Sequence, residues 1–147
     1  MVSAASSAGA AQPGARLYVP HERSGVRLAR HAVADQLMAA GVSGAVRDDA
    51  VLVLSELVSN AVRHAAPLPS GEITVTWRLQ GDVLHVEATD GGATTRPQAT
   101  EAGGSSLGGR GLAIVRVLSR HWGFTEGDGS VTVWAELPTT RDPAGGN

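Results

Sequence analysis

Residues 48–66 constrain the fold more than any other stretch, because their apolar spacing suits an amphipathic helix. Asp48 and Asp49 are expected in or near its first turn, where acidic side chains suit the helix dipole, and Pro67 is expected to end it. The apolar stripe repeats at spacings of three and four residues and consists of Val51, Leu54, Val58 and Val62, widened by Ala50, Leu57, Ala61 and Ala65. Such a stripe has to be buried against another layer of the fold.

A second, polar stripe runs along the same helix. Glu56 and Asn60 are four residues apart, so their side chains lie one above the other, and Arg63 and His64 continue the stripe by one turn. Asn is a poor helix former in a helix interior, so the presence of Asn60 at this position calls for an explanation. A carboxylate and an amide oxygen on one stripe suit a hard cation such as Mg²⁺, or the carboxylate could act as a general base toward a hydroxyl. The alternative is a solvated helix face that binds nothing.

Composition narrows the class of protein. A length of 147 residues suits one domain with a real core, and a net charge of −2 argues against a nucleic-acid surface. The sequence has no cysteine and no lysine, which excludes disulfides, thiol chemistry and lysine chemistry. No apolar run approaches the roughly 20 residues of a membrane span, and residues 1–14 lack the features of a secretion signal. We therefore expect a cytoplasmic protein that contacts neither membrane nor nucleic acid directly.

The rest of the pattern predicts an α+β two-layer sandwich, with a mixed, mainly antiparallel sheet and about three helices on one face. Residues 15–138 are expected to form this domain, between flexible tails at 1–14 and 139–147. A helix capped by Ser24 and ended by Gly41 is expected before the long helix. Strands are expected at 16–20, 72–79, 83–88 and 131–137, and a last helix at 110–120. Residues 122–126 are expected to form a strand or a turn that leads into one.

The end of the strand at 83–88 carries a second polar signal. Asp90 follows this strand and is succeeded by Gly91 and Gly92. An ionised Asp there could accept a hydrogen bond from an amino group such as the exocyclic amine of adenine, and Gly92 would let a planar ring approach the backbone. The alternative is a plain turn, because Asp-Gly is a common turn dipeptide. Residues 93–109 follow without periodicity, which is typical of a lid, a binding loop or disorder.

Glycines also open the helix at 110–120. The run Gly108-Gly109-Arg110-Gly111-Leu112 would expose backbone N–H groups at a helix N-terminus, which bind phosphate with help from the helix dipole. The alternative is a flexible linker that meets a helix. The run is neither the dinucleotide fingerprint, because no strand precedes it, nor a P-loop, because the chain has no lysine.

The three signals occur in an informative order. A Glu-x-x-x-Asn helix, a hairpin, a strand ending in Asp-x-Gly, a glycine-rich stretch and Gly-x-Gly-Leu on a helix together resemble the Bergerat-fold (GHKL) ATP-binding domain of gyrase, Hsp90, MutL and histidine kinases. The resemblance covers residues 17–138. The phrases VLVLSELVSNAVRHA, GGRGLAIVRVLSRHWG and TVWAELP look like the anti-sigma-factor serine/threonine kinases of bacterial partner-switching systems.

This resemblance implies a role for each matching residue. Glu56 would be the catalytic base, or would orient the attacking hydroxyl, and Asn60 would bind the Mg²⁺ that bridges the phosphates of ATP. Asp90 would accept from the adenine amine, with Gly92 beneath the ring. The remaining cofactor-binding residues would be Arg63, His64, Gly109, Arg110, Gly111, Leu112 and, through water, Thr132. Residues 93–108 would be the lid over ATP.

The resemblance also implies partners and leaves two functions open. A kinase of this family would phosphorylate an anti-anti-sigma protein of the STAS fold and sequester a sigma factor, and relatives are often homodimers. The chain departs from the family at Thr94, where a glycine is usual, and at residues 130–133, where a Lys is lost. These departures favour the alternative, a non-catalytic nucleotide-gated module that regulates transcription factors by binding them. A histidine-kinase fragment is disfavoured, because no dimerisation helix pair surrounds His21 or His31.

Overall fold

The computed structural model describes residues 13–92 and 110–140, with only the backbone described at 110–112. The expectations for the tails at 1–12 and 141–147, for the lid, for Thr94 and for Gly109 therefore lie outside the described residues. Within these ranges, no helix is both long enough and apolar enough to cross a membrane.

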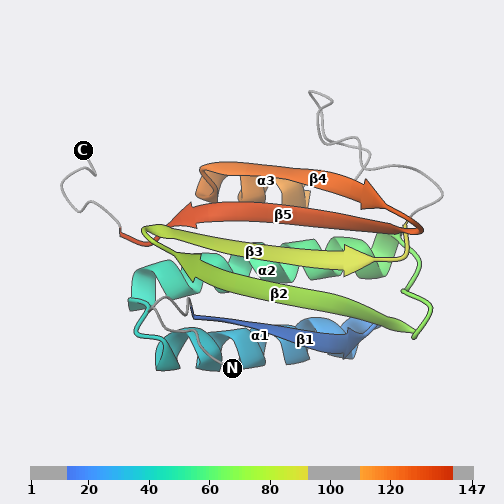
Figure 1. The fold of residues 1–147 in the computed structure, drawn as a ribbon, viewed down its shortest axis with the longest axis horizontal. Coiled ribbons are helices and arrows are strands. Elements are labelled where there is room, and N and C mark those ends of the chain that lie inside the picture. The colour runs from blue at the N-terminus through green and yellow to red at the C-terminus, as the bar shows by residue number, and fades with distance from the viewer. Residues whose placement is uncertain (1–12, 93–109, 141–147) are drawn as a thin grey trace, which may run out of the picture.

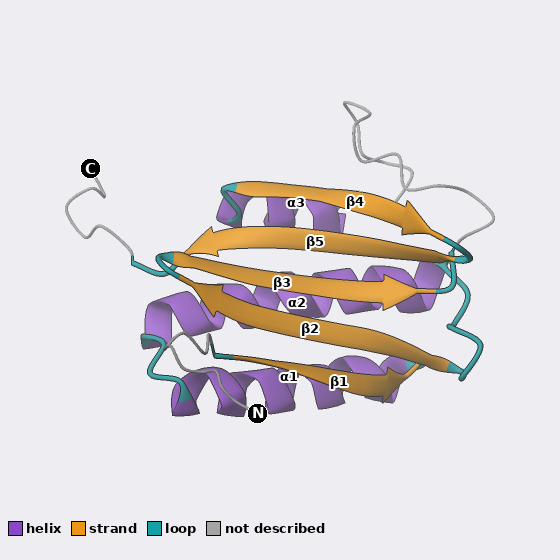
Figure 2. Cartoon of the chain, viewed as in Figure 1, coloured by secondary structure: helices purple, strands orange, loops and turns teal. Residues whose placement is uncertain are grey.

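Five strands form one sheet, and the helices all cover the same face of it (Figures 1 and 2). The sheet order is β1-β2-β3-β5-β4, and every pairing between the described strands is antiparallel rather than mixed. The elements are β1 (Gly14–Pro20), α1 (Arg23–Ala39), α2 (Gly44–His64), β2 (Glu72–Gln80), β3 (Val83–Asp90), α3 (Arg110–Leu118), β4 (His121–Gly127) and β5 (Ser130–Pro138). The predicted α+β two-layer sandwich is confirmed.

Helix α2 begins one turn earlier than predicted. Its first residue is Gly44 and Ser43 is its N-cap, because the buried stripe extends back to Val46, which is 2% exposed. Asp48 and Asp49 consequently lie in the second turn, and the prediction that they sit at the helix start was wrong in that respect. The fully buried stripe also differs from the predicted one: it comprises Val46, Ala50, Val53, Leu54, Leu57, Val58 and Ala61.

Helix α1 begins at Arg23 with Glu22 as N-cap, so the expectation that Ser24 caps the helix was wrong. Its end was predicted correctly. Gly41 adopts a φ of +84°, and its N–H donates to the carbonyl of Met38 while the N–H of Val42 donates to that of Leu37, both at 3.0 Å. This is the Schellman arrangement, in which a left-handed glycine satisfies the last carbonyls of a helix.

The core lies between the helices and one face of the sheet. Alternate residues of β3 (Leu84, Val86 and Ala88) are at most 1% exposed and face the helices. Removing a side chain such as Leu54 or Leu84 from water contributes about 1.5–3 kcal/mol each. The indole N–H of Trp77 donates to the Gln36 side chain at 2.6 Å and ties the sheet to α1. This packing places the C-terminal end of α2 against the end of β3.

The opposite face of the sheet carries a charged cluster. His85, 8% exposed, faces Glu87 through Nε2 at 2.9 Å and Glu136 through Nδ1 at 3.3 Å, and it stacks on Trp134. Only the doubly protonated ring can donate to both carboxylates. The hydrogen bond from His85 lowers the pKa of Glu87, although partial burial opposes this shift.

We expect this cluster to make stability sensitive to acid. Because the pKa of Glu87 is lowered in the folded chain from its ordinary value of 4.5, its contribution is complete above that pH and is lost as pH falls through the folded value. Glu87→Gln should therefore cost about 0.5–1 kcal/mol at neutral pH, and this cost should disappear once the pH has fallen below the lowered pKa of Glu87 in the folded chain. Urea unfolding of both proteins across this range measures the difference, and a gap that is independent of pH would contradict the assignment.

Candidate functional site

The end of β3 is fastened to the end of α2 by two backbone hydrogen bonds. The N–H of Ala66 donates to the carbonyl of Gly92 at 2.9 Å, and the N–H of Gly91 donates to the carbonyl of Ala66 at 2.8 Å. Gly91 has no room for a side chain, because a Cβ would collide with the carbonyl of Pro67. The turn after β3 is thereby held beside the last turn of the helix that carries Glu56 and Asn60.

Asp90 is a buried carboxylate on the helix-facing side of the sheet. It is 5% exposed, and its Oδ1 accepts the Gly92 N–H at 2.7 Å, with Gly92 in the left-handed region at a φ of +89°. Burial raises the pKa of Asp90, and the Gly92 N–H and the charge of His21 offset this only in part. A buried carboxylate in this state gains from a further hydrogen-bond donor.

His21 contributes to the same corner, although its sequence context does not predict a role for it there. Its Nε2 lies 2.7 Å from the carbonyl oxygen of Ala65 and 3.0 Å from that of Ala61, so it caps the last turn of α2. These partners are 44 and 40 residues away in the chain. The only local signal was a polar aromatic residue directly after a strand, which is too common to identify a cap.

Asn60 is 7% exposed, and its side chain is only partly satisfied. Its Oδ1 accepts a hydrogen bond from Arg63 at 3.1 Å, while Nδ2 is buried without a partner among the described residues. Nε2 of His64 is likewise buried and unpaired within the described chain. A buried polar atom without a partner costs about 1–3 kcal/mol, so unpaired atoms gathered at one helix end are typical of a site that receives a polar ligand.

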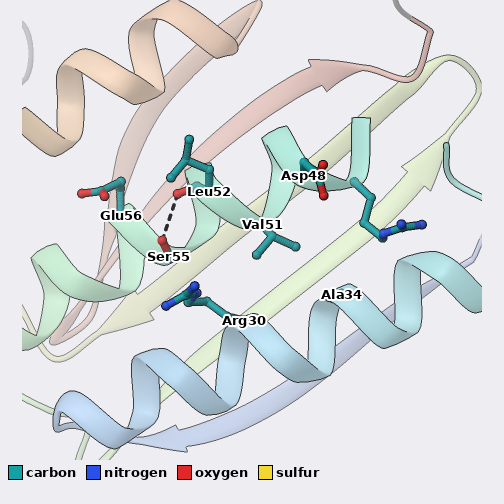
Figure 3. Close-up of a pocket in the computed structure, with 8 residues that line it drawn as sticks. Arg30, Ala34, Asp48, Val51, Leu52, Ser55 and Glu56 are labelled. Carbon is teal, nitrogen blue, oxygen red and sulfur yellow. Dashed lines mark hydrogen bonds between the residues drawn. The ribbon is translucent and has the colours of Figure 1, made fainter. Parts of the chain in front are cut away.

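Glu56 is half-buried one turn before Asn60. It borders a groove of about 540 Å³ between α1 and α2, whose other lining residues are Arg30, Ala34, Arg47, Asp48, Val51, Leu52 and Ser55. Figure 3 shows Ser55 and Val51 pointing toward α1, whereas Glu56 and Leu52 point to the other side of α2. Glu56 is therefore accessible at the rim of the groove and lies on the same helix stripe as Asn60.

Thr132 does not join this site. Along β5 the side chains alternate, and Val131, which pairs in register with Asp90, occupies the helix-facing side. Thr132 lies on the opposite face, where its hydroxyl is 2.7 Å from that of Thr89. The assignment of Thr132 to adenine was therefore wrong, and Val131, 8% exposed, is the β5 residue beside Asp90.

The remaining predicted ligands sit at the start of α3. The helix begins at Arg110 and includes Gly111 and Leu112, so its first N–H groups have no partner within the helix. No group of three or more His, Asp or Glu side chains in the described parts of the chain is placed to hold a metal ion. A metal ion would thus take few protein ligands, and Asn60 with water and phosphate oxygens would suit Mg²⁺, which usually keeps several waters.

Comparison with known proteins identifies relatives of this fold. The model of the histidine kinase-like ATPase domain family matches residues 19–137. The fold is similar to that of the RsbU and RsbW domains of Rv1364c from Mycobacterium tuberculosis, with 22% sequence identity and a TM-score of 0.67 over 86% of this chain and 32% of that chain. It is also similar to a structure of the SiaB-SiaC complex from Pseudomonas aeruginosa, with 18% identity and a TM-score of 0.61 over 84% of this chain and 88% of that chain. The chain therefore spans about a third of the first of these structures, and no curated protein matches it.

Proposed function

The chain belongs to the histidine kinase-like ATPase domain family, and from this premise we propose that it binds MgATP between the end of α2 and the turn after β3. The buried carboxylate of Asp90 carries the proposal. Oδ1 is committed to the Gly92 N–H, and Oδ2 accepts from the adenine amine. Val131 and Gly92 flank the base, and the N–H groups at the start of α3 receive phosphate oxygens.

Asn60 would hold the Mg²⁺ that accompanies the nucleotide, and the metal would supply neutralisation of the phosphate charge. Arg63 and His64 belong to the last turn of α2 and would provide hydrogen-bond donors to the phosphates. His21 and the backbone bonds between Ala66 and Gly92 keep the two halves of the site in place before ATP arrives. Such preorganisation is how a phosphoryl-transfer site gains most of its rate.

The bound nucleotide serves as a phosphoryl donor to a partner protein. The hydroxyl oxygen of a partner serine or threonine attacks the γ-phosphorus in line, the bond from that phosphorus to the β,γ-bridging oxygen breaks, and ADP leaves. Glu56 accepts the hydroxyl proton, and its place at the groove rim leaves room for the partner to approach. The partner is an anti-anti-sigma protein of the STAS fold, and its phosphorylation frees this chain to hold a sigma factor.

Two observations favour the alternative, a nucleotide-gated binding module without kinase activity. The described residues supply few metal ligands, and the lysine usual before the last strand is absent. Incubation of the wild-type chain with ATP radiolabelled on the γ-phosphate and a STAS protein from the same genome separates the two functions. Label on a serine or threonine of the partner supports the kinase. ATP binding without transfer of the label supports the binding module instead of the kinase. The absence of ATP binding would contradict both proposed functions.

A further inference from the structure

A hydrogen bond joins Arg63 to the oxygen that the metal is proposed to use. Nη2 of Arg63 donates to Oδ1 of Asn60 at 3.1 Å, from one helix turn away. Asn60 is buried, whereas Arg63 is exposed and reaches inward to it. Within the described residues, Arg63 forms no ion pair, so no carboxylate neutralises its charge there. A full positive charge therefore stands at the amide oxygen of Asn60.

This arrangement conflicts with a metal ion at the same oxygen. An amide oxygen has two lone pairs, so the hydrogen bond alone does not fill it. Two cations that share one oxygen repel each other strongly, and partial burial of the site weakens the screening of that repulsion by water. Metal entry therefore requires the guanidinium to leave.

A triphosphate provides the reason for Arg63 to leave. The guanidinium fork matches the oxygens of a phosphate, which offer it charge as well as hydrogen bonds, whereas the Asn60 oxygen is neutral. The buried Nδ2 of Asn60 lacks an acceptor in the described chain, and a phosphate oxygen would supply one. Both side chains are therefore better satisfied once Arg63 has moved to the phosphates.

We propose that Arg63 blocks the metal-facing oxygen of Asn60. The site therefore does not bind free divalent cations, and it binds the metal only together with nucleotide. Arg63 is in this role a positioning residue, which acts through Asn60. The consequence is positive coupling between nucleotide and metal, with the Arg63 side chain as the two-state element. The inference rests on the proposed MgATP site and adds that the metal enters this site only with the nucleotide.

Paramagnetic broadening by Mn²⁺ tests, without any activity assay, whether Arg63 prevents metal binding at Asn60. With Mn²⁺ alone, the Asn60 side-chain amide of the wild-type chain should keep its NMR signal, and it should lose the signal when ATP is added. Arg63→Gln removes the charge but keeps a hydrogen-bond donor, so Mn²⁺ alone should broaden Asn60 at about tenfold lower concentration than in the wild type. Arg63→Lys keeps the charge and should resemble the wild type, as should Arg78→Gln, which removes an exposed charge from β2.

Two results would overturn the proposal that Arg63 blocks the metal. In the first, Mn²⁺ alone broadens the Asn60 signal of the wild type at the concentration that affects Arg63→Gln. In the second, the Asn60 signal of Arg63→Gln resists Mn²⁺ as well as that of the wild type does. A different result tests the proposed function itself. If Mn²⁺ with ATP leaves Asn60 unaffected in the wild-type chain, the metal site is misassigned, whatever Arg63 does.

Discussion

Glu56→Gln is expected to slow phosphoryl transfer to the partner protein by about 100- to 10,000-fold, the range that a positioned general base contributes. The amide has nearly the same shape as the carboxylate but cannot accept the hydroxyl proton. Glu56 lies on the groove side of the site rather than at the adenine turn, so the affinity for MgATP should change by no more than about twofold. Single-turnover transfer of the γ-phosphoryl group, measured with saturating ATP, gives the rate of the chemical step.

Asp48→Asn is the matched control for this variant. Asp48 belongs to the same helix and lines the same groove two turns earlier, so its loss changes the local charge equally without touching the reacting hydroxyl. Its transfer rate should stay near that of the wild type. A Glu56→Gln protein that transfers phosphate at the wild-type rate would show that Glu56 is not the base, and an equal loss in Asp48→Asn would assign the effect to groove charge.

Asp90→Asn is expected to weaken ATP binding by about 10- to 100-fold or more, which corresponds to the 1.5–3 kcal/mol of a hydrogen bond to a charged group. An asparagine oxygen can still accept the Gly92 N–H, so the turn after β3 is preserved. The second carboxylate oxygen is replaced by an NH₂ group. This group and the adenine amine are both hydrogen-bond donors, so the bond between them is lost. Calorimetric titration with MgATP measures the loss, and exposed Asp82→Asn at the far end of β3 is the control.

The same substitution should leave the unliganded fold as stable as the wild type, or more stable. Burial raises the folded pKa of Asp90 above its ordinary value of 3.8, so the folded chain holds its proton to higher pH than the unfolded chain does. Stability therefore falls as pH rises from about 3.8 through the folded pKa, and the penalty persists at neutral pH. Asp90→Asn removes it. An unfolded variant, or unchanged ATP affinity in a folded one, would contradict the assigned role of Asp90.

The sequence predicted most of the fold because its signals are local. Alternation marked four of the five strands, and Gly41 marked the end of α1. The start of α2 was misplaced because Val46 reveals its burial only once the helices pack. Glu56 and Asn60 could be paired from helical spacing alone.

The site depends on relations that local patterns do not contain. Thr132 and Val131 exchange faces if β5 shifts by one residue, so the choice between them requires the observed register with Asp90. His21 meets Ala61 and Ala65 only through tertiary folding, and the bond between Arg63 and Asn60 requires an exposed arginine to reach inward to a buried amide. The order of the motifs along the chain suggested the proposed ATP site, whereas the arrangement of its residues depends on packing.

Recognition of the adenine amine by Asp90 is the central claim, and titration of the wild-type chain with MgATP and with MgITP tests it most directly. ITP carries the same triphosphate, but its base has a carbonyl oxygen where adenine has the amine. A carboxylate at this position should repel that oxygen, so we expect ATP to bind at least about tenfold more tightly than ITP. Equal affinities would mean that Asp90 does not read the base, and that the nucleotide site is wrongly placed.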